Sequence, residues 1–313
     1  MPLAPEAQAL LDQMAALNAP PLHTLEPAAA RAMFDAAPLP EVRSPVARTE
    51  DRSIPGPLGE IPVRIYQSPG DRGTLVFYHG GGFMLGGIES HDEVCHTLST
   101  GAGCSIVAVD YRMAPEHPYP AAPEDAYAAL VWVAENGDSL GLDTSRLAVG
   151  GDSAGGNLSA VVSVMARDRG GPELALQFLI YPAVDMSQDY PSFRENASGY
   201  MLDVDSVNYF LRHYAPDEAR HQEPYLAPIF AGSHVGLPTA LIQTAEFDPL
   251  RDQGKAYAEK LSAAGVAVTY TCYEGMLHGF YNFGFAWPSR ADAVEEGAAA
   301  LREAFAAAGV GVS

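Results

Sequence analysis

Basic residues are scarce in this sequence of 313 residues, which has 18 Lys and Arg against 39 Asp and Glu and a formal net charge of −21. Only two of the basic residues are lysines, Lys255 and Lys260. A surface that binds a nucleic-acid backbone needs clustered basic side chains, and anionic membrane surfaces repel an acidic protein. We therefore expect neither nucleic acid nor a membrane as a partner.

Cysteine is equally sparse. The three cysteines, Cys95, Cys104 and Cys272, are widely separated and form no C-x-x-C pair, so neither a disulfide framework nor a cysteine-based zinc site is predicted. The sequence also lacks an apolar run of about 18 residues, and its first residues include neither a basic region nor an apolar signal stretch. We expect a cytoplasmic protein without a bound metal.

What is present is the composition of a folded globular protein, with 48% hydrophobic and 18% charged residues. Near-continuous apolar runs alternate with helical patterns, which is typical of strands buried on both faces of a mostly parallel sheet. An antiparallel hairpin precedes them. The predicted strands are 48–54, 61–66, 74–78, 105–110, 147–150, 176–181, 239–244 and 266–273, and the predicted helices are 93–100, 123–135, 154–167, 251–264 and 291–308. The fold class is α/β, with helices on both faces of the sheet.

Two segments depart from this alternation. The first has helical patterns at 6–17 and 27–34 with no strand between them. The second is a connection of about 57 residues between the strands ending near Tyr181 and beginning near Thr239, with one helix predicted at 204–213. A connection this long in a compact domain is typical of a lid. We predict a helical cap formed by residues 1–45 and 185–225, and a core formed by residues 46–184 and 226–313.

The strongest chemical signal is a G-x-S-x-G motif, Gly151 to Gly155, which follows a short apolar strand and opens a helix. In that context the serine occupies a sharp strand-to-helix turn, and the helix directs free N–H groups and the positive end of its dipole toward the hydroxyl. The alternative is a glycine-rich turn with an incidental serine. We predict that Ser153 is a nucleophile.

A nucleophilic serine needs an adjacent base and an acid that orients the base, in the chain order serine, acid, histidine. Five of the nine histidines precede Ser153 and three lie before the next strand, so only His278 follows a strand that could carry the acid. Asp248 lies just beyond that strand, directly before a proline, and is the preferred acid. Asp252 and Glu246 are the alternatives; a helix cap and a surface charge are their non-catalytic interpretations.

Three glycines, Gly80 to Gly82, follow the predicted strand 74–78. Acyl transfer places negative charge on the former carbonyl oxygen, and main-chain N–H groups held toward that point stabilise it. We expect the N–H groups of Gly81, Gly82 and Ala154 to form this oxyanion hole, with Gly80 shaping the loop. The alternative is a phosphate or cofactor loop, but the sequence has no G-x-x-x-x-G-K-[ST] motif, and no G-x-G-x-x-G opens a helix at the first strand-to-helix turn.

Taken together, these motifs resemble those of the hormone-sensitive-lipase-like esterases, which have the α/β-hydrolase fold. The matching motifs lie at 79–82, 110–118, 151–155, 248–251 and 278–280, and the resemblance covers roughly residues 45–310. It implies a carboxylesterase that hydrolyses small-molecule esters with short to medium acyl chains through a Ser-His-Asp triad and an acyl-enzyme, without a cofactor. It also implies a helical cap and a homodimer formed through the last edge strand. Arg112 and Glu116 are expected to brace the loops around the site by ion pairing.

Substrate contacts are expected from the cap and from residues beside the catalytic motifs. The candidate substrate-binding residues are Phe83, Asp152, Tyr200, Phe210 and Leu211, with Phe34 as a further candidate lining residue of the acyl pocket. Bulky side chains there would shorten the pocket, although aromatic residues at helical spacing also form cap cores.

Two other functions fit the same fold. One is amide hydrolysis by the same triad, and the other is binding without catalysis, as in the plant gibberellin receptors, where the catalytic histidine is replaced. The intact His278 favours the enzyme.

Overall fold

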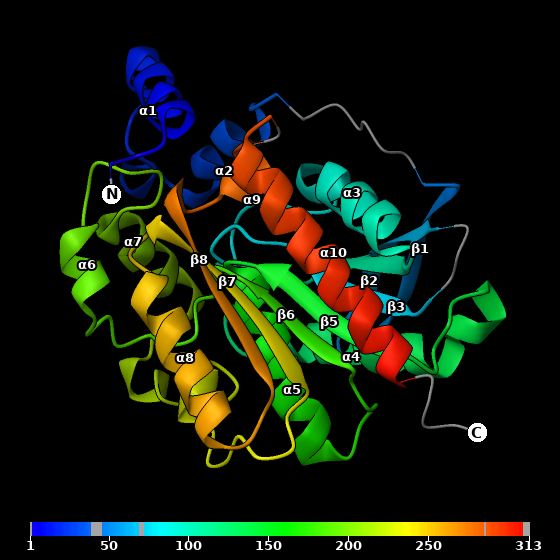
Figure 1. The fold of residues 1–313 in the computed structure, drawn as a ribbon. Coiled ribbons are helices and arrows are strands. Elements are labelled where there is room, and N and C mark those ends of the chain that lie inside the picture. The colour runs from blue at the N-terminus through cyan, green and yellow to red at the C-terminus, as the bar shows by residue number, and fades with distance from the viewer. Residues whose placement is uncertain (1, 39–45, 69–71, 285, 309–313) are drawn as a thin grey trace.

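A single mixed sheet of eight strands forms the centre of the molecule (Figure 1). The computed structural model describes residues 2–38, 46–68, 72–284 and 286–308. The strand order is β1-β2-β4-β3-β5-β6-β7-β8; β3 to β8 are joined in parallel, and β1 and β2 add an antiparallel edge. The strands are β1 (Arg48–Gly56), β2 (Gly59–Gln67), β3 (Thr74–Tyr78), β4 (Ser105–Val109), β5 (Leu147–Asp152), β6 (Leu176–Ile180), β7 (Thr239–Phe247) and β8 (Val268–Leu277). The predicted α/β-hydrolase fold with a mostly parallel sheet is confirmed.

Helices cover both faces of this sheet, which explains why its central strands are apolar throughout. Every residue of β3, β4, β5 and β6 is buried. Alternate residues of β3 serve opposite faces: Val76 and Tyr78 belong to the core under α4 (Ala121–Asn136) and α5 (Ala154–Arg169), whereas Leu75 and Phe77 belong to the core under α3 (Asp92–Ala102) and α10 (Pro288–Ala308). A third cluster lies under α8 (Arg251–Ala263).

The last two strands extend farther than predicted. β7 ends at Phe247 rather than Thr244, and β8 ends at Leu277 rather than Tyr273. The extension is possible because a register shift between Ala245 and Phe247 lets the pairing resume as Phe247 with Leu277. Polar residues in these last strand positions hide the strand ends in the sequence. Because of the extension, both strands reach the site.

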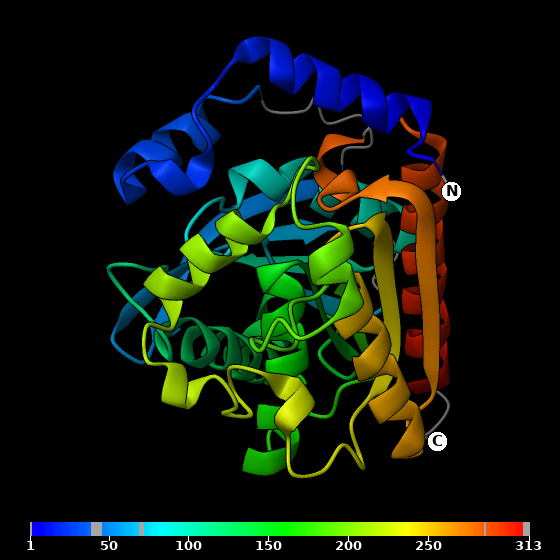
Figure 2. The same cartoon turned by 90° about the vertical axis from the view of Figure 1, so that its left-hand side faces the viewer.

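Two distant parts of the chain add helical segments outside the sheet, and α1 (Pro5–Leu17) and α2 (Pro27–Asp35) lie over one end of the core (Figure 2). The first part comprises these two helices and η1 (Leu22–Thr24). The second lies between β6 and β7 and comprises α6 (Pro191–Glu195), α7 (Val204–Tyr214), η4 (Glu218–Arg220) and η5 (Pro228–Phe230). The two parts touch where η1 meets α7. Their division from the core at 45/46, 184/185 and 225/226 stays a prediction, and residues 39–45 lie outside the described residues.

The remaining elements are short helices in the connections: η2 (Glu89–His91), η3 (Gly137–Leu140) and α9 (Phe280–Phe283). Over the described ranges, no helix combines the length and the apolar character that crossing a membrane requires.

Candidate active site

Ser153 occupies a sharp turn between β5 and α5. Its φ of 54° and ψ of −114° lie outside the conformations that residues with a side chain favour. Its N–H donates to the carbonyl of Ile180 at 2.8 Å, which ties the turn to β6. A Cβ at Gly151 or Gly155 would lie 2.2 or 1.8 Å from the carbonyl oxygen of Tyr78, so only glycine fits on either side of the serine. The motif spacing is thus explained by the close approach of β3.

His278 brings Ser153 and Asp248 together. Its Nε2 lies 2.9 Å from Ser153 Oγ and its Nδ1 lies 2.7 Å from Asp248 Oδ2. Because a carboxylate only accepts hydrogen bonds, Nδ1 carries a hydrogen and Nε2 is left to accept the hydroxyl proton. Asp248 is fully buried; its Oδ1 accepts the N–H of Leu250 at 2.8 Å, and its carbonyl accepts a hydrogen bond from Asn196 at 3.1 Å. Both the side chain and the main chain of Asp248 are therefore held by hydrogen bonds.

The two alternative acids point elsewhere. Asp252 lies in α8 and accepts the N–H of Ser192 at 2.9 Å. Glu246 lies within β7 and accepts the N–H of Gly275 at 2.7 Å. Asp248 is the carboxylate that contacts His278.

The glycine-rich loop after β3 turns back on itself. Gly81 has a φ of 115° and Gly82 a φ of 62°, conformations that L side chains rarely adopt, and a Cβ at Gly81 would lie 2.0 Å from the carbonyl oxygen of Leu85. Within the described part of the chain, the N–H groups of Gly81 and Gly82 have no acceptor in the protein. Ala154 is the first residue of α5, a position whose N–H has no partner inside its helix. These three groups are able to bind an oxygen of a ligand.

Asp152, directly before the nucleophile, is buried beneath this loop. Its Oδ1 accepts the N–H of Gly80 at 2.9 Å and lies 3.0 Å from His91 Nε2, and its Oδ2 accepts a hydrogen bond from Asn282 at 3.0 Å. Burial raises the pKa of this carboxyl group, but the opposing effects of His91 and the Gly80 N–H hold it below its ordinary value. The side chain is occupied by protein groups, which differs from the substrate contact expected from the sequence.

Two aromatic residues of the predicted substrate-binding set lie where α7 meets the core; Phe83 contacts this helix and Phe210 belongs to it. Phe83 is buried, and its ring stacks on Tyr214 with centroids 3.7 Å apart and 6° between the planes. It supports α7 instead of facing outward. Phe210 lies against the oxyanion loop, because a Cβ at Gly82 would fall 2.3 Å from its Cγ.

The other predicted lining residues are distributed around the same region. Phe34 of α2 and Leu211 of α7 are partly buried against one core cluster, the one that also contains Phe83. The ring of Tyr200 lies 5.1 Å, centroid to centroid, from that of Phe247, the residue before Asp248. The cap thus places apolar side chains near both the oxyanion loop and the acid.

Arg31 of α2 ties the cap to two loops of the site. Its Nε donates to the carbonyl of Met84 at 2.9 Å, and its Nη2 donates to the carbonyl of Ala114 at 2.5 Å. Nη1 and Nη2 also pair with the two carboxylate oxygens of Glu116 at 2.7 and 2.6 Å. These hydrogen bonds from Arg31 lower the pKa of Glu116 to about 2. The cap is therefore anchored directly behind the oxyanion loop.

The loop 110–118 is braced at its other end by Arg112. Its Nε and Nη2 pair with the buried carboxylate of Asp125 in α4 at 2.8 and 2.7 Å. The neighbouring Tyr111 donates from its hydroxyl to the carbonyl of His79 at 2.7 Å and stacks on the His79 ring. Arg112 and Glu116 both form the bracing ion pairs that the sequence led us to expect.

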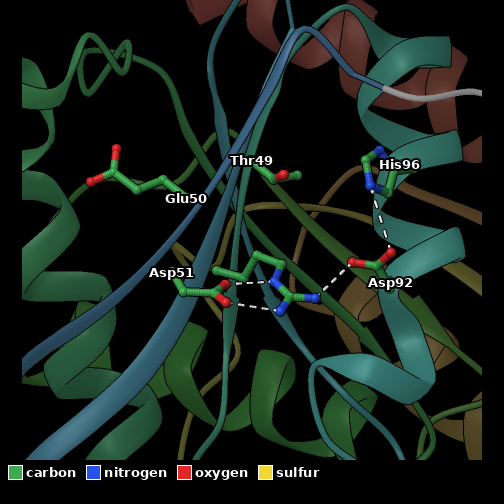
Figure 3. Close-up of a pocket in the computed structure, with 6 residues that line it drawn as sticks. Thr49, Glu50, Asp51, Asp92 and His96 are labelled. Carbon is green, nitrogen blue, oxygen red and sulfur yellow. Dashed lines mark hydrogen bonds and ion pairs between the residues drawn. The ribbon is translucent and has the colours of Figure 1, made fainter.

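A hollow of about 300 Å³ lies at the opposite edge of the sheet, between β1, β2 and α3 (Figure 3). Four of its charged groups are paired with one another: Arg64 contacts Asp51 at 2.6 Å and Asp92 at 3.0 Å, and His96 lies 3.6 Å from Asp92. Glu50 pairs instead with Arg48 and Arg52, outside the hollow, at 2.7 and 2.6 Å. Across the described ranges, no cluster of three or more His, Cys, Asp or Glu side chains is arranged to hold a metal ion. We assign no chemistry to this hollow.

Comparison with known proteins defines the class. Residues 75–282 match the model of a family described as having the α/β-hydrolase fold, and the chain belongs to this family. It is 46% identical over 282 residues to carboxylesterase NlhH of Mycobacterium tuberculosis, covering 88% of each chain. It is 39% identical over 230 residues to an ethyl acetate hydrolase of Pseudomonas putida, covering 72% of each.

A solved structure extends this similarity. An ester hydrolase from the metagenome of Lake Arreo, complexed with a bipyridine phosphonate derivative, superposes with a TM-score of 0.91 at 40% identity, covering 97% of this chain and 99% of the other. By family and relatives the chain is an enzyme of the serine carboxylic ester hydrolase class.

Three residues that shape the site were not found from the sequence: Arg31, His91 and Asn282. The chain-order argument sets His91 aside as a base because it precedes Ser153, and it says nothing about other roles. A single sequence carries no signal that separates Arg31 or Asn282 from ordinary polar residues of short helices.

Proposed function

We propose that the protein hydrolyses small-molecule carboxylic esters with short to medium acyl chains, using Ser153, His278 and Asp248 through an acyl-enzyme. The observation that supports this most directly is the position of His278, whose two ring nitrogens lie 2.9 Å from the serine hydroxyl and 2.7 Å from the buried carboxylate. Such an arrangement makes a serine hydroxyl nucleophilic at neutral pH.

In the first half of the reaction, Ser153 Oγ attacks the ester carbonyl carbon while His278 Nε2 accepts the hydroxyl proton. The bond to the alkoxy group then breaks, and His278 returns the proton to the departing alcohol. In the second half, His278 takes a proton from water, the water oxygen attacks the acyl carbon, and the proton returns to Ser153 as the carboxylic acid leaves. Asp248 stabilises the imidazolium that forms in both halves.

The N–H groups of Gly81, Gly82 and Ala154 are the proposed oxyanion hole. Each donor that is aimed at the developing oxyanion lowers the barrier by about 2.7–4 kcal/mol. The loop conformation and the free N–H groups of Gly81 and Gly82 support this role. The mechanism uses protein groups and water alone.

Within the α/β-hydrolase family, the five motifs and the two-part cap support placement among the hormone-sensitive-lipase-like esterases. The names of two relatives, a carboxylesterase and an ethyl acetate hydrolase, support small esters as substrates. Phe210, Leu211, Tyr200 and Phe34 are proposed to limit the acyl pocket, and the contact of Phe210 with Gly82 supports this for Phe210. We propose that acetate to butyrate esters are preferred over long-chain esters.

The test compares the wild-type protein with Ser153→Ala on p-nitrophenyl butyrate. We expect turnover to fall to the level of the buffer, and near-normal turnover by the variant would refute the assignment. A phosphonate ester should label wild-type Ser153 with loss of its leaving group, which separates an enzyme from a binding protein. If the protein cleaved an anilide faster than the matched ester, the proposed activity would be amide hydrolysis instead of ester hydrolysis.

The proposed homodimer has an available edge. β8 pairs with β7 on one side, and among the described strands none pairs with its other side. An exposed strand edge is a template for a second copy. Light scattering should give twice the mass of the chain, and Val268→Pro in β8 should convert this to a monomer. The carbonyl of Ala267 accepts from Ala240 of β7, so the N–H of Val268, the next residue, lies on the free side of the strand, and proline removes this donor.

A further inference from the structure

The buried carboxylate of Asp152 takes no part in the proposed proton transfers, although it is adjacent to the nucleophile. Its surroundings come from three separate parts of the chain. Gly80 belongs to the oxyanion loop, His91 to η2, and Asn282 to α9, four residues beyond His278. One carboxylate therefore joins the segments that carry the nucleophile, the oxyanion donors and the base.

Two N–H groups donate to the Asp152 carboxylate, which only accepts: that of Gly80 at 2.9 Å and the side-chain amide of Asn282 at 3.0 Å. His91 Nε2 lies 3.0 Å from Oδ1 and 3.1 Å from Asn282 Nδ2, and the Tyr181 hydroxyl lies 3.5 Å from Oδ2. Hydrogen bonds to an ionised group are about twice as strong as neutral ones. The His91 ring is itself held, because its Nδ1 lies 2.8 Å from Ser90 Oγ.

The fit is close on the loop side. A Cβ at Gly80 would lie 2.4 Å from Asp152 Oδ2 and 2.9 Å from the Asp152 carbonyl oxygen. The main chain of the loop therefore rests directly on the residue before Ser153. The next two residues of this loop, Gly81 and Gly82, carry the proposed oxyanion donors.

We propose that Asp152 is a positioning residue for ester hydrolysis: by holding the Gly80 N–H, its carboxylate places the N–H groups of Gly81 and Gly82 relative to Ser153. His91 and Asn282 keep the carboxylate in place and connect it to the histidine segment. This inference rests on the proposed function. Asp152 acts without touching substrate, so its loss impairs the transition state more than substrate binding.

The test starts from Asp152→Asn, which keeps the size of the side chain. An amide offers one acceptor oxygen where the carboxylate offers two, so either Asn282 or the Gly80 and His91 pair meets an N–H instead of an oxygen. We expect kcat for p-nitrophenyl butyrate to fall about 10- to 100-fold, below the loss of about 10²–10³ for removing one oxyanion donor. KM should change by less than about threefold, because ground-state binding is kept.

An inhibitor that mimics the tetrahedral intermediate distinguishes a positioning role from a merely structural one, because a structural role would leave its inhibition constant unchanged. The inhibition constant of a butyl trifluoromethyl ketone should rise by the same factor by which kcat/KM falls. All rates are divided by the concentration of Ser153 labelled by a phosphonate at completion, so that unfolded protein does not count.

A charge swap tests the network directly. In the double variant Asp152→Asn/Asn282→Asp, the amide at position 152 donates to the new carboxylate at position 282 and keeps its oxygen for Gly80 and His91. We expect the double variant to regain at least about tenfold in kcat over Asp152→Asn alone, since every donor again has an acceptor.

Asp143→Asn is the matched control. Asp143 lies before the other end of β5 and its carboxylate also accepts a main-chain N–H, that of Ser145, at 3.1 Å. It should lower the melting temperature without changing kcat. Unchanged kcat and inhibitor affinity in Asp152→Asn, or no recovery in the double variant, would overturn the inference. Turnover by Ser153→Ala would instead overturn the proposed function itself.

Discussion

Phe247 and Leu277 are register partners at the ends of β7 and β8, and Asp248 and His278 follow them directly in the chain. Neighbouring strands of a sheet lie about 4.8 Å apart, so the sheet itself sets the spacing of the proposed acid and base. The contact of 2.7 Å between His278 Nδ1 and Asp248 Oδ2 then needs only the side chains to turn toward each other. The contact between Asp248 and His278 therefore continues the strand pairing of β7 and β8.

Asp248→Asn should lower kcat by about 10³–10⁴, because an asparagine can donate to His278 Nδ1 and favour the wrong tautomer. Stopped assays with p-nitrophenyl butyrate at neutral pH measure the loss. Asp252→Asn, the neighbouring acid that contacts Ser192, should change kcat by less than about twofold. Equal losses in the two variants would mean that His278 is oriented by another group.

Gly82→Ala should impair catalysis through the cap. Alanine at a φ of 62° costs about 1–2 kcal/mol by itself, and its Cβ would also collide with the ring of Phe210. We expect kcat to fall more than about tenfold, in line with displaced oxyanion donors.

Gly265→Ala is the control for Gly82→Ala, because it has the backbone cost of alanine at positive φ without a steric collision. Gly265 has a φ of 82°, and an added Cβ there would meet no described atom within 4 Å. Urea unfolding should show a loss of about 1 kcal/mol for this variant with unchanged kcat. Adding Phe210→Ala to Gly82→Ala should recover part of the activity, and no recovery would show that the ring does not cause the defect.

Phe210→Ala should change the acyl preference. Removing the ring that lies on Gly82 lengthens the proposed pocket, so the ratio of kcat/KM for octanoate over acetate esters should rise about tenfold, the size of effect that one or two methylenes have in a pocket. Arg212→Ala, an exposed residue of the same helix, is the control and should leave the ratio unchanged. A constant ratio in Phe210→Ala would remove this residue from the pocket wall.

The stability that α2 gains from the Arg31–Glu116 ion pair should fall at acidic pH. Hydrogen bonding to Arg31 lowers the pKa of Glu116 from its ordinary value of 4.5 to about 2. A depressed pKa adds stability that is complete above pH 4.5 and is lost as the pH falls toward 2. The melting temperature of the wild type should therefore exceed that of Glu116→Gln at pH 7, and the difference should shrink between pH 4.5 and 2.

The control for this prediction is the same Glu116→Gln substitution made in an Arg31→Gln variant. In that background, Glu116→Gln should have no pH-dependent effect on the melting temperature over the same range, because the partner is gone. A pH-dependent difference that persists there would show that another group titrates. The side chain of Glu116 is 55% exposed, so the shifts are small and need a common buffer ionic strength.

Chain order and local motifs select Ser153, Asp248 and His278 as a candidate triad, because each follows a strand at the same end of a parallel sheet, and the structure places these three side chains in contact. The apolar runs end β7 and β8 three and four residues too early, since polar residues such as Glu246 and Glu274 interrupt the runs while the backbone pairing continues. Backbone pairing continues past polar side chains, and the strand preference of a residue depends on its surroundings, so the apolar run alone does not mark these strand ends.

The surroundings of Asp152 could not be predicted in the same way. Its partners are up to 130 residues away, and their meeting depends on how η2 and α9 pack. A polar residue beside a nucleophile is naturally interpreted as facing the substrate. Only its burial and its contacts with Gly80, His91 and Asn282 show that it faces the protein.

Arg31 gives the cap a thermodynamic connection to the reaction. One guanidinium holds α2 to the carbonyl of Met84, which lies two residues beyond Gly82, so docking of that helix and ordering of the loop are linked equilibria. Linkage is reciprocal: a ligand that orders the loop favours the docked helix by the same factor by which the docked helix favours the ligand. A bound tetrahedral mimic is therefore expected to slow amide hydrogen exchange in α2.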